Sequence, residues 1–306
     1  MTSLAVALHS LAKKVIDGRK TVGGVHRVSG NKNAVLPMIA ASVLTADTVV
    51  LENVPDISDV ETMLEAARGF GAKVSRDLKN GTVAISTPKI VSAVIRPELA
   101  SKIRTSFLFA GPLLSRLGRA SLPPPGGDAI GLRRLDTHFA GFKALGAKAK
   151  AGVKTLSFKG ELKGAKILLD EASVTATENI LMASVLAKGR TVIYNAASEP
   201  HVVDLAKMLN KMGANIRGAG SNRIEIKGVE KLHGCTARVG CDYIEAGSYI
   251  AAAAVTGVSR ICNNRHWLSD VVAGAAVGIG AVELGYFLTD LIFREKHLYD
   301  GYEKPH

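Results

Sequence analysis

Cysteine is scarce in this sequence, and the motifs that commonly hold metals or nucleotides are missing. Its three cysteines among 306 residues cannot form a complete set of disulfides and do not have the spacing of paired zinc ligands. The eight histidines are scattered without metal-ligand spacing. Neither Gly23-Gly24 nor Gly126-Gly127 has the strand-turn-helix context of a Walker or dinucleotide-binding loop. The sequence therefore predicts a cytoplasmic protein with reduced thiols, no metal and no cofactor.

Aromatic residues are also few, and they gather at one end of the chain. Residues 259–306 hold six of the fifteen, including the single Trp. The net charge is +12, and this last segment holds five basic and six acidic residues, so the first 258 residues carry +13. Single-stranded nucleic acids are bound by stacking on aromatic side chains, which the basic body has in small number. We therefore expect anionic ligands other than nucleic acid, and a boundary between two different pieces near Val258.

The N-terminal residues 1–24 do not match a secretory signal. Their apolar stretch precedes the basic residues Lys13, Lys14, Arg19 and Lys20, whereas a signal peptide has its positive charge first. An amphipathic leader helix is the better interpretation.

The body of the chain repeats itself three times. A Gly-Ala pair at Gly71, Gly146 and Gly213 closes an amphipathic helical pattern in each copy, where glycine suits the left-handed residue that ends a helix. Two strand-like runs follow each pair, and a more apolar helix and another strand precede the amphipathic helix. The expected amphipathic helices span 59–68, 136–144 and 203–211, and the apolar ones 33–44, 105–117 and 177–186. The expected strands include 48–51, 82–85, 120–122, 155–158, 191–194 and 223–226.

Three such units cannot bury their apolar helices separately, but they can pack those helices against one another with the sheets outside. We therefore predict a pseudo-threefold α/β domain over residues 25–230.

The copies differ where chemistry is expected. The strand-to-helix loop of the second copy is expanded to residues 123–135, a Pro/Gly-rich segment that carries Asp128, Arg133 and Arg134. The apolar helices begin near Lys32-Asn33, Arg104 and residues 175–178. Helix N-termini attract phosphate and carboxylate groups, and an added Lys or Arg strengthens such a site.

Six stretches carry a family resemblance in the right order: 29–37, 53–60, 104–106, 125–131, 173–179 and 242–247. Over residues 27–255 the chain resembles the UDP-N-acetylglucosamine 1-carboxyvinyltransferase (enolpyruvyl transferase) family. The resemblance implies an inside-out α/β barrel domain and transfer of an enolpyruvyl group from phosphoenolpyruvate to UDP-N-acetylglucosamine in peptidoglycan precursor synthesis. Both substrates are polyanions, in agreement with the basic body.

The same resemblance implies roles for individual residues. Lys32 and Asn33, with Arg133, would contact phosphoenolpyruvate, and Lys32 would take part in catalysis. Asp128 occupies the place where the family usually has a cysteine, and would act as the general acid toward the enolpyruvate methylene. The residues expected to hold the UDP-sugar are Arg104, Arg133, Arg134, Leu135, Asp136, Thr137, Ser173 and Val174. Two departures from the family pattern are Thr175, where Gly is common, and Tyr243, where Arg is usual.

The resemblance is expected to stop near Thr256, so residues 231–258 would be a fragment of a second, incomplete domain. The family's proposed base and its closing arginine have no counterpart here. The tail, 259–306, places Arg260, His266 and Asp270 as in the last motif of phosphatidic-acid-phosphatase-type lipid phosphatases, and an apolar helix is expected at 271–293. That family's Pro-Ser-Gly-His motif is absent, so phosphatase activity is not expected.

Three interpretations stay open. The chain is a cytoplasmic enolpyruvyl transferase, or a non-catalytic UDP-sugar-binding domain tethered to a membrane through 271–293, or a non-native fusion. The apolar segment would either enter a membrane or pack on the domain.

Overall fold

The computed structural model describes residues 26–126 and 135–262. Three units with the same order of elements follow one another along the chain. The first contains α2 (Lys32–Ser42), β1 (Thr48–Glu52), α3 (Ser58–Gly69), β2 (Lys73–Asp77) and β3 (Thr82–Ser86). The second contains η2 (Arg104–Phe109), α5 (Ala110–Leu117), β4 (Arg119–Leu122), α6 (Asp136–Ala144), β5 (Lys148–Ala151) and β6 (Leu156–Lys159). The third contains α7 (Val174–Ser184), β8 (Arg190–Tyr194), α8 (Pro200–Lys211), β9 (Asn215–Arg217) and β10 (Arg223–Lys227).

Each unit forms its own antiparallel sheet, and strands from the connections extend two of these sheets. The strand orders are β11-β1-β3-β2, β4-β6-β5 and β7-β8-β10-β9, where β7 is Lys166–Leu168 and β11 is Thr236–Arg238. Strand β7 pairs in parallel with β8, and β11 pairs in parallel with β1. The chain therefore returns from the third unit to the first sheet, beyond residue 230 where the domain was expected to end. A three-residue strand is too short to show an alternating pattern, so only tertiary pairing reveals it.

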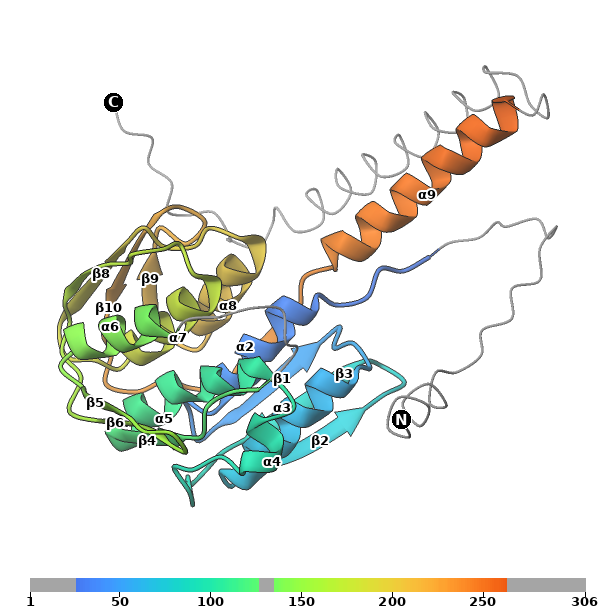
Figure 1. Cartoon of the computed structure of the whole chain (residues 1–306). Helices are drawn as coiled ribbons and strands as arrows, with labels where there is room; N and C mark the ends of the chain where they lie inside the picture. Colours follow the sequence, from blue (N-terminus) through green and yellow to red (C-terminus); the bar gives the residue numbers. More distant parts are fainter. Residues whose placement is uncertain (1–25, 127–134, 263–306) are drawn as a thin grey trace, which may run out of the picture.

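The apolar helices lie in the centre, as predicted (Figure 1). Every residue of α2 from Ala34 to Ser42 and of α7 from Ala176 to Ser184 is buried. Helix α5 packs on α7, and α2 packs on η2 and α8, while the sheets lie around them. Helices that are apolar on all sides are stable only inside a protein, which explains this arrangement. The repeated glycines have the expected positive φ, +101° at Gly71, +95° at Gly146 and +97° at Gly213.

The apolar helix expected at 105–117 is divided in two. Its first part is the 3₁₀ helix η2, and the α-helix α5 begins only at Ala110. A proline inside an α-helix clashes with the carbonyl four residues earlier, which for Pro112 is that of Leu108. The side chain of Asn179 on α7 replaces the lost helical bonds, because its Nδ2 donates to Phe107 O at 2.9 Å and its Oδ1 accepts from Gly111 N at 2.7 Å.

Helix α9 (Tyr243–Cys262) extends away from the body (Figure 1). Its apolar side chains Ile244, Ile250 and Val255 are 61%, 71% and 70% exposed. Among residues 26–126 and 135–262, no helix combines the length and apolar composition needed to cross a membrane. The segment 271–293 and the tail residues His266 and Asp270 lie outside the described residues.

Candidate functional site

Three of the predicted stretches meet at the beginnings of η2, α6 and α7. Arg104 begins η2, Leu135 directly precedes α6, and Thr175 lies in the first turn of α7. These residues line one cavity of about 10 Å³ together with Thr105, Phe107, Leu108 and His138. A cavity of this size holds at most about one water molecule, so the three elements are in close contact. The structure thus brings together residues 71 positions apart in the sequence.

His138 joins these elements, and the sequence analysis did not identify it. Its side chain is buried, its ring packs edge-on against Phe107 with centroids 5.0 Å apart, and its Nε2 lies 3.3 Å from Thr175 Oγ1. The Asn179 Nδ2 group lies 3.3 Å from the other ring nitrogen, Nδ1. Since an amide NH₂ only donates, Nδ1 accepts and the proton of the neutral ring is on Nε2, which donates to Thr175.

Burial, and secondly the positive charge of Arg104, lower the pKa of His138 from its usual 6.5 to about 3. The ring is therefore neutral at physiological pH and acts as a structural link beside Arg104. A single histidine on a helix forms no sequence pattern from which its burial or its role could be predicted. The one available signal was its place directly after Thr137, in a stretch already predicted to bind.

The other predicted residues near this cavity have distinct positions. Thr137 is buried, and its Oγ1 donates to Asp170 Oδ1 at 2.7 Å. Ser173 is the N-cap of α7, where its side chain accepts from Ala176 N at 3.4 Å, and Val174 is the first residue of that helix. Asp136 is exposed at the first position of α6. Their arrangement leaves the backbone N–H groups of two helix starts facing the same region as Arg104.

Lys32 and Asn33 begin the buried helix α2. The N-cap Asn31 is buried and accepts from Ala34 N at 3.1 Å, which fixes the start of the helix. The Lys32 ammonium lies 3.0 Å from Asp59 Oδ2, in the first turn of α3, and both side chains are partly exposed. Asn33 is exposed. A lysine at a helix N-terminus is suited to an anionic ligand, and in this structure Lys32 is paired with Asp59.

The loop predicted to carry the acid spans the gap between β4 and α6. Asp128, Arg133 and Arg134 lie outside the described residues. Both ends of the loop are placed: Gly126 N donates to Ala100 O at 2.9 Å, and Leu135 lines the cavity beside Arg104. A side chain at Gly126 would collide with the backbone, because its Cβ would lie 1.9 Å from Ser101 O. The two described residues that flank the loop therefore lie beside Ala100 and beside Arg104.

A second buried group missed in sequence is Glu178, in α7. Its side chain is fully buried, and its Oε1 has no hydrogen-bond partner among the described residues. Burial and, to a smaller extent, the charge of Glu199 raise the pKa of Glu178 well above its usual value. Burial therefore favours the protonated form of Glu178. In the sequence, residues 175–178 had been predicted only as the start of the third apolar helix.

The chain is similar to curated proteins of one named activity. Two curated relatives are UDP-N-acetylglucosamine 1-carboxyvinyltransferases: that of Treponema pallidum (strain Nichols) is 55% identical over 242 residues, and that of Borreliella burgdorferi (strain ATCC 35210 / DSM 4680 / CIP 102532 / B31) is 50% identical over 244. These matches cover 79% of this chain, which spans 56% and 57% of the two relatives.

Solved structures of enolpyruvyl transferases share the fold. NikO from Streptomyces tendae has a TM-score of 0.66 at 24% identity and covers 77% of this chain and 56% of its own. EPSP synthase from Acinetobacter baumannii has a TM-score of 0.61 at 24% identity and covers 76% and 53%. The predicted inside-out α/β fold of the enolpyruvyl transferase type is thus confirmed.

A family model also matches the sequence, over residues 16–272. This range extends past Thr256, where the resemblance was expected to stop, and includes the segment 259–270. It also begins within the expected leader. Because the match covers most of the 306 residues, the chain belongs to the family described as EPSP synthase (3-phosphoshikimate 1-carboxyvinyltransferase).

Proposed function

We propose that this chain transfers the enolpyruvyl group of phosphoenolpyruvate to the 3-hydroxyl of UDP-N-acetylglucosamine and releases phosphate, in the cytoplasm, for peptidoglycan synthesis. The observation that carries the proposal is the meeting of Arg104, Leu135 and Thr175 at helix starts, in a chain 55% identical to a relative named for this activity. Backbone N–H groups at the starts of α6 and α7, with the Arg104 guanidinium, suit the diphosphate of a UDP-sugar.

The positions of the side chains support the following proposed parts in binding. Arg104 would contact the UDP-sugar directly. Thr137 would act through its backbone, because its hydroxyl is already bonded to Asp170. The exposed side chain of Asp136 and the start of α7 at Ser173 and Val174 would complete this side of the site.

The reacting groups would come from α2 and the loop 123–135. Lys32 and Asn33, with Arg133, would hold the anionic groups of phosphoenolpyruvate. As the sugar hydroxyl oxygen adds to C2 and gives its proton to water, Asp128 would give its proton to the C3 methylene. Return of a proton from C3 to the Asp128 carboxylate and departure of phosphate from C2 would then restore the double bond. Nearby anions raise the pKa of a carboxylic acid, which favours its proton-donating form.

The second candidate function is binding of UDP-N-acetylglucosamine without turnover. It is favoured by the cluster of Arg104, Leu135 and Thr175 at helix starts, which supplies groups for binding. Enolpyruvyl transfer also requires a site closed to water, so binding of the UDP-sugar and turnover can be measured separately.

The test measures phosphate release from phosphoenolpyruvate with and without UDP-N-acetylglucosamine, together with calorimetric binding of the UDP-sugar. We expect Arg104→Ala to weaken binding of the UDP-sugar by about 10- to 100-fold, the value of a charged hydrogen bond. Lys32→Ala should reduce phosphate release with a smaller effect on sugar binding. Arg217→Ala, on the exposed strand β9, is the control. Binding without phosphate release would support the second candidate, and unchanged binding in Arg104→Ala would reject the site.

Asp128 also predicts a response to epoxide inhibitors such as fosfomycin. A carboxylate is a much weaker nucleophile than the thiolate usual at this position. We therefore expect the chain to retain its activity after incubation with the epoxide, and Asp128→Cys to lose it irreversibly. Mass spectrometry of both proteins checks the prediction, and an adduct on Asp128 in the unsubstituted chain would contradict it.

A further inference from the structure

The outer face of the second sheet carries a row of positive charges. Arg119 on β4 lies directly opposite Lys159 on β6, and Lys159 lies directly opposite Lys148 on β5. All three are exposed, and Lys150 lies two residues farther along β5 on the same face. The inner face is apolar. Alternation along the strands therefore separates a buried side from a cationic one.

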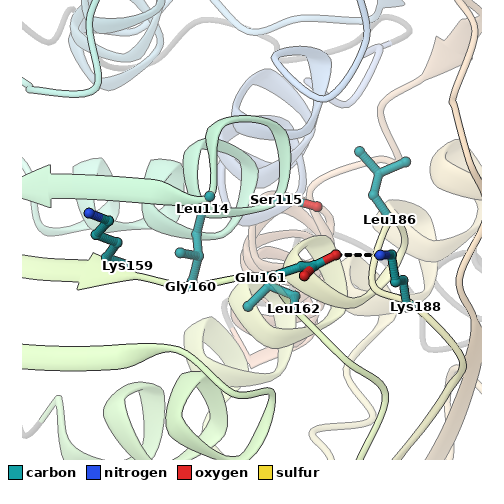
Figure 2. A pocket seen from close by; sticks show the side chains of 9 residues that line it. Leu114, Ser115, Lys159, Gly160, Glu161, Leu162, Leu186 and Lys188 are labelled. Atoms are coloured by element: carbon teal, nitrogen blue, oxygen red, sulfur yellow. Dashed lines mark ion pairs between the residues drawn. The ribbon is translucent and has the colours of Figure 1, made fainter.

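This row is unfavourable for the sheet by itself, because like charges directly opposite each other on neighbouring strands are destabilising. Within the described residues, no carboxylate forms an ion pair with any of the four cations. Lys159 borders an open groove of about 410 Å³, whose other charged side chains, Glu161 and Lys188, pair with each other (Figure 2). Figure 2 shows Lys159 directed away from that pair.

The third sheet also carries outward cations, with Lys227 directly opposite Arg190, but it has no row of three. On the third sheet, Arg190 and Arg223 both pair with Glu225. On the first sheet, the outer face includes the carboxylates of Glu52 and Asp77. Among the described strands, three cations directly opposite one another occur in the second sheet alone.

The substrate site does not explain the row. Arg119 follows the C-terminal end of α5, whereas Arg104 lies at the start of η2, so two helical segments separate them in the chain. Figure 1 shows the sheet of β4, β5 and β6 at the outside of the body.

The turn between β5 and β6 adds an apolar group to this face. Val153 is 95% exposed, the highest value among the large apolar side chains of the described residues. The turn is closed by Gly152 N donating to Thr155 O at 2.9 Å, and Lys154 follows Val153 directly. An exposed apolar tip flanked by Lys150 and Lys154 is suited to an interface that offers both negative charge and hydrocarbon.

We propose that the outer face of this sheet and its β5–β6 turn bind the surface of an anionic membrane. The face presents five cations, Arg119, Lys148, Lys150, Lys154 and Lys159, within the range of four to eight typical of anionic-lipid binding. A bilayer surface requires no shape complementarity and accepts the apolar tip. Single-stranded nucleic acid is less suited, because no aromatic side chain stands on this face for bases to stack on. This surface is independent of the proposed catalytic function.

The experiment is cosedimentation of the full chain with vesicles of phosphatidylcholine, with and without phosphatidylglycerol. The amount of protein bound to neutral vesicles measures any binding through residues 271–293. The additional amount bound to anionic vesicles, called the excess binding below, measures the contribution of the cationic face. Each cation near an anionic surface contributes about 5-fold to the affinity, so Lys148→Glu should reduce the excess binding by at least about 5-fold. High salt should abolish the excess.

The repeat offers matched controls. Lys73 follows Gly71-Ala72 as Lys148 follows Gly146-Ala147, but it lies opposite Ser86 instead of a lysine. Lys73→Glu should therefore leave the excess binding almost unchanged. Val153→Ser should reduce binding, whereas Leu78→Ser, in the corresponding turn of the first unit, should not.

Thermal denaturation separates lost binding from misfolding. Lys148→Glu places opposite charges on β5 and β6, so its Tm should not fall below that of the unsubstituted chain. Equal binding to neutral and anionic vesicles, or equal losses in Lys148→Glu and Lys73→Glu, would overturn the proposal. A higher affinity for a DNA duplex than for anionic vesicles, abolished by Lys148→Glu, would also overturn the proposal, because it would identify nucleic acid as the partner.

Discussion

The buried, neutral His138 should make the stability of this protein depend on pH in a way that one substitution removes. In the folded chain its pKa is about 3, and in the unfolded chain it returns to 6.5. Below pH 6.5 the unfolded state binds a proton that the folded state does not. The stability from this residue is therefore complete above pH 6.5 and is lost as the pH falls toward 3.

The size of the effect follows from the two pKa values. One pKa unit corresponds to about 1.4 kcal/mol, and pH 5 lies about 1.5 units below the unfolded value. His138 should therefore lower the free energy of unfolding by about 2 kcal/mol between pH 7 and pH 5. This is a large share of the ~5–15 kcal/mol that stabilises a typical domain.

Urea denaturation of the full chain at pH 7 and pH 5 measures this change. His138→Gln should be less stable at pH 7, since it loses the bonds to Thr175 and Asn179, but it should lack the additional 2 kcal/mol loss at pH 5. His233→Gln replaces an exposed histidine and is the control. If His138→Gln and the unsubstituted chain lose the same stability between the two pH values, His138 is not the buried neutral group described here.

Two further predictions concern the packing and ionisation of α7. Gly111→Ala would place a Cβ 2.5 Å from the backbone oxygen of Asn179, so it should lower the free energy of unfolding, measured in urea, by about 1–3 kcal/mol. The control is Gly69→Ala, whose Cβ meets no atom within 4 Å and which should be neutral or stabilising. Equal losses of stability in the two variants would contradict this prediction. Burial and the charge of Glu199 raise the pKa of Glu178 in the folded chain. As the pH rises above 4.5, the unfolded chain loses this proton more readily than the folded chain, so the free energy of unfolding falls. Glu178→Gln should therefore stabilise the protein more at pH 8 than at pH 4.5, and a difference independent of pH would show that Glu178 is not protonated in the folded state.

The repeat made most of the secondary structure predictable. Three copies of one pattern reinforce each other, so the expected strand at 82–85 and helix at 136–144 agree with the structure to within a residue. The 3₁₀ start of the second apolar helix was not predicted. Its cause combines a local signal, Pro112, with a distant side chain, Asn179, that supplies the missing hydrogen bonds.

The candidate site was predictable only in part. Residues with charges at helix starts, such as Lys32 and Arg104, are visible in sequence because polar residues interrupt an apolar pattern there. His138 and Glu178 are not, because their roles depend on burial, which a sequence pattern does not report for a single polar residue. The ion pair of Lys32 with Asp59 likewise depends on how α2 and α3 pack.

The sequence by itself determined the threefold order of elements, the buried helices and the sign of the charge, because periodicity and composition are local properties. Tertiary structure alone decided three things: that β11 returns to the first sheet, that His138 loses its charge beside Arg104, and that Arg119, Lys159 and Lys148 form one row. Each depends on strand register or on burial among distant segments. Evenly spread lysines in the sequence became a concentrated surface only when the register of three strands aligned them.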